Sequence, residues 1–125
     1  MIAGIGIDII EVKRVEKLCD RDEKFLAKVF TKTEIEYCRK FKNGSQNFAG
    51  RFAVKEAFLK AMGTGWANGL KFSEIETIND KLGKPEIFLH GKTKEIFEAG
   101  KYEIAHVSIA HLKDYATAVV VIEKK

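Results

Sequence analysis

Two carboxylates and one lysine are the residues whose types and spacing best suit chemistry. Glu56 and Lys60 are four positions apart in a segment predicted to be helical, so their side chains lie on one face. Such a pair is most often a simple surface ion pair, but the aromatic residues and alanines around Glu56 predict that this carboxylate is only partly exposed. A partly buried carboxylate needs a cation, and two carboxylates suit Mg²⁺, which keeps waters and takes phosphate oxygens as further ligands. Asp8 is the candidate second carboxylate, although it is equally suited to cap a helix that begins near Glu11.

A second polar group comes near the end of the chain. His106 and Ser108 alternate on one face of a predicted strand, while Val107, Ile109 and His111 point the other way. Such a pair is placed to reach a phosphate or a nucleotide. A single histidine at the start of a strand is more often a structural hydrogen-bonding residue, so both interpretations stay open.

Basic residues recur in the first helical region, mixed with almost as many acidic ones. They are Lys13, Arg14, Lys17, Arg21, Lys24 and Lys28. A solvated helix face explains this pattern as well as a binding patch does. The net charge of +4 favours polyanionic partners without separating nucleic acid from an acidic protein or a phosphorylated cofactor.

The elements that must position these residues follow from the apolar pattern. Residues 2–10 alternate as a strand. Ala3, Ile5, Ile7 and Ile9 lie on a side expected to be core, and Gly4, Gly6 and Asp8 lie on a side that another backbone, a helix or a ligand can approach closely. Short helices are predicted near residues 12–18, 25–29 and 33–38. Residues 46–62 are predicted to form one long helix that Gly63 ends.

The rest of the chain is mostly strands. Segments 75–78 and 86–89 are expected to pair across a turn at residues 81–85, a short helix follows at 93–98, and strands at 104–112 and 115–122 meet at a turn. This order predicts an α+β fold in which a mainly antiparallel sheet packs on the long central helix, with additional N-terminal helices. Residues 1–125 form one predicted domain, and no regular βαβ alternation supports a dinucleotide-binding fold.

Composition excludes several classes of protein. The apolar fraction of 46% and the charged fraction of 32% are typical of a soluble domain, and no apolar run approaches the roughly 20 residues of a membrane-spanning helix. The first residues lack the features of a signal peptide, so we expect a cytoplasmic protein. Cys19 and Cys38 lie far from the histidines in sequence and form no C-x-x-C motif, which favours reduced structural thiols.

Four segments together indicate a family. The strand GIGIDII, the helix RFAVKEAFLKAMGTG, the turn KLGKP and the strand HVSIAH resemble, in order along the whole chain, the holo-acyl-carrier-protein synthase family of phosphopantetheinyl transferases. The resemblance implies that a serine of an apo acyl carrier protein attacks the β-phosphate of coenzyme A, the co-substrate, and displaces 3′,5′-ADP. It also implies a homotrimer with the cofactor cleft between subunits, and no nucleic-acid or membrane partner.

The resemblance assigns roles by matching position. Asp8 and Glu56 are expected to be the Mg²⁺ ligands, and Lys60 a phosphate contact that acts electrostatically; these three are the expected catalytic residues. Other expected residues of the cofactor cleft are Arg51, Lys55, Gly63, Gly65, Gly83, Lys84, Pro85, His106 and Ser108. The expected docking residues for an acidic carrier are Arg14, Lys17, Arg21 and Lys24. Ala110 departs from many relatives, which carry Ser or Thr there, so a cofactor contact at this position is in doubt.

Two other functions fit some of the same residues. A non-enzymatic RNA-binding α+β module would explain the basic charge, but the strands lack a closely spaced aromatic platform and RNA binding gives Asp8, Glu56 and Lys60 no role. A magnesium-dependent hydrolase of nucleotide phosphates would use the same ion and transfer to water. For the transferase, the base is expected to be Glu56 acting through a metal-bound water, or that water as hydroxide.

Overall fold

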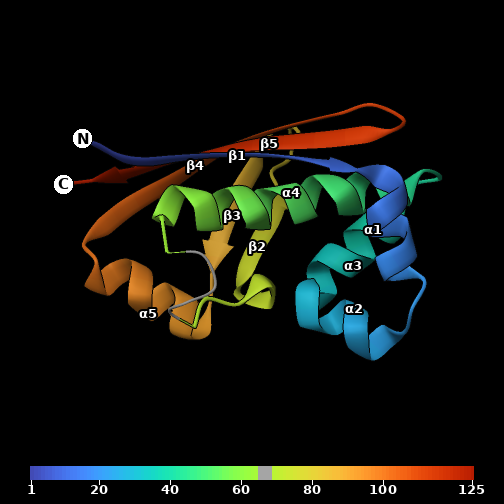
Figure 1. Cartoon of the computed structure of the whole chain (residues 1–125), viewed down its shortest axis with the longest axis horizontal. Coiled ribbons are helices and arrows are strands. Elements are labelled where there is room, and N and C mark those ends of the chain that lie inside the picture. Colours follow the sequence, from blue (N-terminus) through green and yellow to red (C-terminus); the bar gives the residue numbers. More distant parts are fainter. Residues whose placement is uncertain (65–68) are drawn as a thin grey trace.

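The helix α4 (Gly44–Met62) runs along one face of a three-stranded sheet (Figure 1). The computed structural model describes residues 1–64 and 69–125. In chain order the other elements are β1 (Ile2–Glu11), α1 (Val12–Cys19), α2 (Glu23–Val29), α3 (Lys32–Arg39), a 3₁₀ turn (Phe72–Glu74), β2 (Ile75–Asn79), β3 (Pro85–Leu89), α5 (Gly91–Ala99), β4 (Tyr102–His111) and β5 (Tyr115–Lys124). None of the helices in these described ranges is both long and apolar enough to cross a membrane.

Both sheets are antiparallel. In the larger sheet β5 lies between β1 and β4, and β2 and β3 form a separate hairpin. Figure 1 shows the large sheet on one side of α4 and the short helices α2, α3 and α5 on the other. The predicted α+β fold, with a mainly antiparallel sheet on a long helix, is therefore confirmed.

Local sequence signals explain where the helices begin and end. Gly63 ends α4 in the left-handed conformation, with φ of 74°, which glycine adopts without steric cost. Thr31 caps α3: its hydroxyl accepts from the Glu34 backbone N–H, and the Glu34 carboxylate accepts from the Thr31 N–H. The helix α1 begins after Glu11 without a side-chain cap, so Asp8 is not used as one.

The first strand turns its glycine side, rather than its isoleucine side, toward the helix. A Cβ atom built at Gly6 would lie 1.9 Å from the carbonyl oxygen of Ala57, so only glycine lets β1 and α4 approach this closely. Close approach by a helix was one of the predicted uses of this side. The prediction that the isoleucine side is core is wrong for the single chain, because Ile5, Ile7 and Ile9 are 63%, 63% and 67% exposed.

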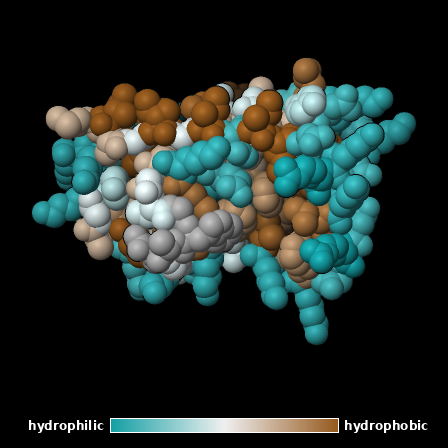
Figure 2. Space-filling model, viewed as in Figure 1, coloured by the Kyte–Doolittle hydropathy of each residue, from teal (hydrophilic) through white to brown (hydrophobic). Residues whose placement is uncertain are grey.

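This apolar surface is visible as a feature of the whole molecule. Figure 2 shows hydrophobic residues in a row along the side of the molecule where β1 runs, whereas the surface around α1 and α2 is mostly hydrophilic. The exposed isoleucines of β1 include Ile2, Ile5, Ile7 and Ile9. Exposed apolar rows of this kind are typical of surfaces that bind another molecule.

Candidate functional site

The structure brings Asp8, Glu56 and Lys60 together at the contact between β1 and α4. The Lys60 ammonium donates to Asp8 Oδ1 at 3.1 Å and to the backbone carbonyl of Ile7 at 2.9 Å. Asp8 is mostly covered, with 16% of its side chain exposed, while Lys60 is 54% exposed and so remains available to a ligand. Lys60 therefore forms its ion pair with Asp8 of β1, instead of with Glu56 one turn earlier on α4.

Glu56 completes the group as a half-buried carboxylate. Burial raises the pKa of Glu56, the negative charge of Asp8 raises it further, and Lys60 acts in the opposite direction. The two carboxylates and one ammonium leave a net negative charge that a divalent cation would neutralise, which fits oxygen ligation of Mg²⁺. In the described ranges no group of three or more His, Cys, Asp or Glu side chains could hold a metal, so the site offers two protein carboxylates at most and leaves coordination positions for other ligands.

The backbone around Asp8 is fixed by its neighbours. Alternation along β1 places Asp8 on the same side as Gly4 and Gly6, the side that faces α4. On the neighbouring strand, the Thr117 hydroxyl donates to the Asp8 carbonyl at 2.7 Å. Strand pairing and glycine packing therefore determine where this carboxylate lies.

His106 and Ser108 lie on the opposite, outer face of the sheet. The register aligns His106 with Val121 and Ile5, and Ser108 with Val119 and Ile7. His106 Nε2 lies 2.8 Å from Glu123 Oε2. Ala110 follows on the same exposed face, where it offers no hydroxyl. Within one chain, these residues and Asp8 are on different sides of the sheet.

Arg51 lies in a small cavity beside the hairpin of β2 and β3. Its guanidinium donates to Asn79 Oδ1 at 2.6 Å and stacks over the Tyr37 ring at 4.2 Å, while its Nε is buried without a hydrogen-bond partner. The cavity measures about 190 Å³ and is lined in addition by Gly83, Pro85 and His111 among others. A second cavity of about 330 Å³, between β3 and β4, is lined by Lys84, Pro85 and His106. The two cavities share Pro85, so the turn predicted for the cofactor cleft borders both.

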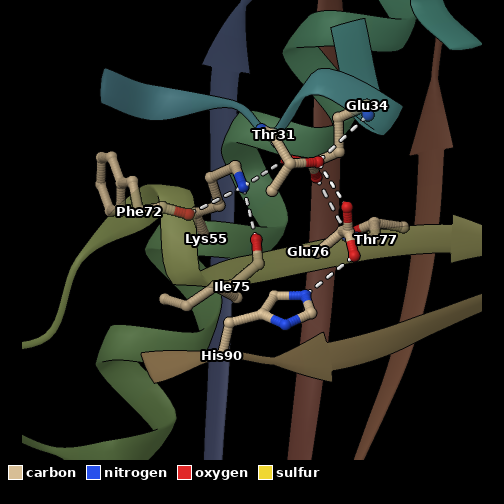
Figure 3. A network of polar contacts seen from close by, with 8 residues as sticks. All are labelled: Thr31, Glu34, Lys55, Phe72, Ile75, Glu76, Thr77 and His90. Atoms are coloured by element: carbon tan, nitrogen blue, oxygen red, sulfur yellow. Dashed lines mark hydrogen bonds and ion pairs between the residues drawn. The ribbon is translucent and has the colours of Figure 1, made fainter. Parts of the chain in front are cut away.

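Lys55 is placed differently from what the sequence led us to expect. Its side chain is fully buried, and its ammonium donates to Glu34 Oε1 at 2.8 Å, to the Phe72 carbonyl at 2.9 Å and to the Ile75 carbonyl (Figure 3). Burial lowers the pKa of Lys55, and Glu34 partly offsets this effect. The expectation that Lys55 contacts the cofactor is therefore corrected: all three ammonium protons are used inside the protein.

The remaining predicted residues are separate from the carboxylates or outside the described ranges. Gly63 ends α4, and Gly65 lies among the residues that the structure does not describe. Arg14, Lys17, Arg21 and Lys24 are all exposed: the first two are on α1, Arg21 follows it with its guanidinium 4.9 Å from the Phe25 ring centre, and Lys24 is on α2. The surface around these two helices is mostly hydrophilic.

The polar network of Figure 3 continues from Glu34 to the surface. The Thr31 hydroxyl donates to Glu76, whose other carboxylate oxygen lies 2.9 Å from His90 Nε2. Burial raises the pKa of Glu76, but the hydrogen bonds from Thr31 and His90 outweigh it, so the pKa lies below its ordinary value of 4.5. The ionised form is thus favoured by folding.

The Glu76→Gln variant is expected to be less stable than the wild type in a pH-dependent way. A carboxyl group with a lowered pKa stabilises the fold fully above pH 4.5, and this contribution is lost as the pH falls through the folded-state pKa. We expect a loss of about 1–3 kcal/mol in the free energy of unfolding at pH 7, which shrinks toward pH 3. Urea unfolding from pH 3 to pH 7 measures it, and a loss that does not change with pH would contradict the assignment.

Comparison with known proteins identifies the class of protein that this fold and site define. The chain belongs to the 4′-phosphopantetheinyl transferase superfamily, whose family model matches residues 4–120, and it is an enzyme of that class. A curated relative from Clostridium tetani, named holo-[acyl-carrier-protein] synthase, is 47% identical over 123 residues and is matched over 98% of this chain and 97% of its own length. The family that the sequence motifs resembled is therefore confirmed.

Solved structures agree with this assignment. A holo-(acyl-carrier-protein) synthase from Bacillus anthracis, in complex with CoA (3′,5′-ADP), is 40% identical with a TM-score of 0.82, over 100% of this chain and 99% of that chain. The holo-[acyl-carrier-protein] synthase of Neisseria meningitidis is 34% identical with a TM-score of 0.89, over 99% and 100% of the two chains. The fold is shared over the full length.

Several residues that hold the site together are absent from the predicted set. Glu34 accepts from Lys55 and is itself held by Thr31. Asn79 accepts from Arg51. A lysine within an apolar stretch of helix was the available signal, because a buried ammonium requires a carboxylate partner. That signal does not say which carboxylate, since Glu34 precedes Lys55 by 21 positions.

Proposed function

We propose that the protein transfers the 4′-phosphopantetheine group of coenzyme A to a serine of an apo acyl carrier protein and releases 3′,5′-ADP. The observation that carries this proposal is the grouping of Asp8, Glu56 and Lys60 in a chain of the phosphopantetheinyl transferase superfamily. The serine oxygen forms a bond to the β-phosphorus, the pyrophosphate bridge breaks, and 3′,5′-ADP leaves with the electron pair. Positioning and charge stabilisation dominate such a phosphoryl transfer.

Each residue of the group has a role in this proposal. Asp8 and Glu56 would hold Mg²⁺, which when bound supplies positive charge beside the pyrophosphate oxygens. Lys60, already held at this position by Asp8 and exposed on its other side, donates to a phosphate oxygen of the leaving group. Glu56, whose pKa is raised, takes up the serine proton through a water molecule.

The outer face of the sheet supports a site shared between subunits of a homotrimer. The isoleucines of β1 are exposed on the same face as His106 and Ser108, so a second copy that covers the isoleucines also lies against these two residues. Asp8 and Glu56 are on the other side of the same sheet. A site that uses both groups needs more than one chain, and the cavity at Lys84, Pro85 and His106 would then receive the cofactor from the neighbouring subunit's side.

Arg14→Glu is expected to weaken recognition of the carrier protein. Arg14 is exposed on α1 in the predicted docking patch, and a negative charge there repels an acidic partner. We expect the KM for carrier to rise about ten-fold while the KM for coenzyme A stays nearly unchanged. Steady-state kinetics with each substrate varied measures both values. Lys94→Glu, the same kind of charge reversal on the exposed surface of α5, is the control. Equal rises in the two KM values of Arg14→Glu would contradict a separate docking patch.

One incubation distinguishes the proposed transfer from its alternatives. The protein is mixed with coenzyme A, Mg²⁺ and apo carrier protein, and the carrier is weighed by mass spectrometry. A gain of one phosphopantetheine group supports transfer, and 3′,5′-ADP release without carrier modification supports a hydrolase. The absence of both changes favours a binding module.

We further propose that this reaction takes place in the cytoplasm, where the enzyme would encounter both substrates.

A further inference from the structure

The helix that carries Glu56 has no polar face that would orient it. Its buried positions cover most of the circumference and include the polar residues Arg51 and Lys55, and from Phe48 to Met62 only Phe52, Glu56 and Lys60 form a narrow, less buried stripe, which mixes apolar and polar side chains. Burial of apolar area alone therefore does not select one rotation of α4 about its axis. The rotation nevertheless decides whether Glu56 faces Asp8, so a more specific contact has to set it.

Two contacts hold α4 from nearly opposite sides. On one side Ala57 and Ala61 pack directly against Gly6 and Gly4 of β1. On the other side is Lys55, since helical positions two apart point about 160° from each other. Glu56 lies between these two sides, at about 100° from each.

The contact made by Lys55 is rigid because its partners are themselves held. Glu34 accepts from the Thr31 N–H and the Thr77 N–H, each at 3.0 Å, in addition to the Lys55 ammonium (Figure 3). The carbonyls of Phe72 and Ile75 belong to the 3₁₀ turn and to the start of β2. One ammonium thus links α4 to α3 and to the chain that enters β2.

We infer that the buried pair of Lys55 and Glu34 positions Glu56, one of the two proposed metal ligands. The pair sets the rotation of α4 and so holds Glu56 beside Asp8. This inference rests on the proposed function. Lys55 and Glu34 are positioning residues, because neither touches the substrate. A buried ion pair is weak evidence for added stability, and the hydrophobic surroundings would tolerate a neutral pair, but a neutral pair would not fix the helix in one rotation.

The decisive variant is the double substitution Lys55→Met with Glu34→Gln. Lys55→Met alone leaves Glu34 buried without its ammonium and is expected to unfold at a much lower temperature. The double variant has no unpaired buried charge. The one amide oxygen introduced by Glu34→Gln still accepts from the Thr77 N–H, whereas the link to α4 and the hydrogen bond from the Thr31 N–H are lost. We expect the melting temperature of the double variant to lie well above that of Lys55→Met and closer to that of the wild type. The Mg²⁺ concentration for half-maximal transfer should remain about ten-fold or more above that of the wild type.

A second readout separates this effect from loss of activity in general. Mn²⁺ binding to the protein without substrates, followed by electron paramagnetic resonance, should weaken in the double variant by the same factor, while the KM for carrier stays unchanged. Leu26→Ala is the control. It creates a cavity beneath α2 and lowers the melting temperature, but it leaves the hydrogen bonds of Lys55 in place. Leu26→Ala should leave Mn²⁺ binding as in the wild type.

The outcomes that would overturn the inference are specific. A folded double variant with the metal response of the wild type would show that the pair is merely structural. An equal loss of Mn²⁺ binding in Leu26→Ala would show that any destabilisation has the same effect. A wild-type protein that binds no Mn²⁺ would instead refute the metal site of the proposed function, and the inference with it.

Discussion

Glu56→Gln is expected to slow transfer by about a hundred-fold or more at limiting metal concentration. The substitution keeps the size of the side chain but removes the charge of one of two proposed carboxylate ligands, and it removes the group proposed to take up the serine proton. The fold should survive, because burial and the charge of Asp8 make the ionised form of Glu56 unfavourable in the folded protein. Transfer rates across a Mg²⁺ titration measure the effect, with circular dichroism as the check on folding.

Glu95→Gln is the matched control for this substitution. Glu95 is an exposed carboxylate on α5 and is placed in no site, so its loss should leave the rate unchanged. Near wild-type rates for Glu56→Gln at low metal concentration would remove Glu56 from the proposed site. A defect that high Mg²⁺ fully restores would assign Glu56 to metal binding and would contradict its role in proton uptake.

Two inactive variants are expected to restore each other when they are assembled together. Asp8→Ala leaves the strand of His106 intact, and His106→Ala leaves both carboxylates intact. In a cyclic trimer with sites between neighbours, every mixed ring has one interface that pairs an intact Asp8 with an intact His106, so about one third of wild-type activity should return. Neither homo-oligomer has such an interface.

The experiment requires mixed assemblies of known composition. The two variants are co-expressed with different tags, purified through both tags and assayed beside each parent. Activity confined to the doubly tagged species is the expected result. If the mixed species forms from folded but inactive parents and stays inactive, the division of the site between subunits is wrong.

The elements of the fold were predictable because their signals are local. Gly63 directly follows the apolar run of α4, and Thr31 precedes Glu34 at the spacing of a capping box, so each position can be recognised from a few neighbouring residues. The grouping of Asp8, Glu56 and Lys60 combined one helical spacing with one family resemblance. In the structure Glu56 and Lys60 lie on one side of α4, as the helical spacing predicts, and Asp8 lies beside them.

The faces of β1 were not predictable for a physical reason. Alternation separates Ile5, Ile7 and Ile9 from Gly4, Gly6 and Asp8, but it does not show which side meets the rest of the same chain. The usual assumption, that the more apolar side is the core, fails where a helix packs on glycine and the isoleucines remain exposed. The prediction for Lys55 was wrong for a related reason. Lys55 stands next to Glu56 in the family motif, but its hydrogen-bond partners belong to α3 and β2, and spacing along α4 does not reveal them.

The order of strands in the large sheet also constrains how the protein folds during synthesis. Among the described residues β1 pairs with β5 alone. Asp8, whose carbonyl accepts from Thr117, therefore gains its strand partner only after more than a hundred further residues have been made. Until β5 leaves the ribosome, β1 is an unpaired strand with an isoleucine side, and sheet formation requires the closure of almost the whole chain as one loop. The slow step of folding should therefore be the docking of β5 between β1 and β4, and a nascent chain stalled before that step should be prone to aggregation through β1.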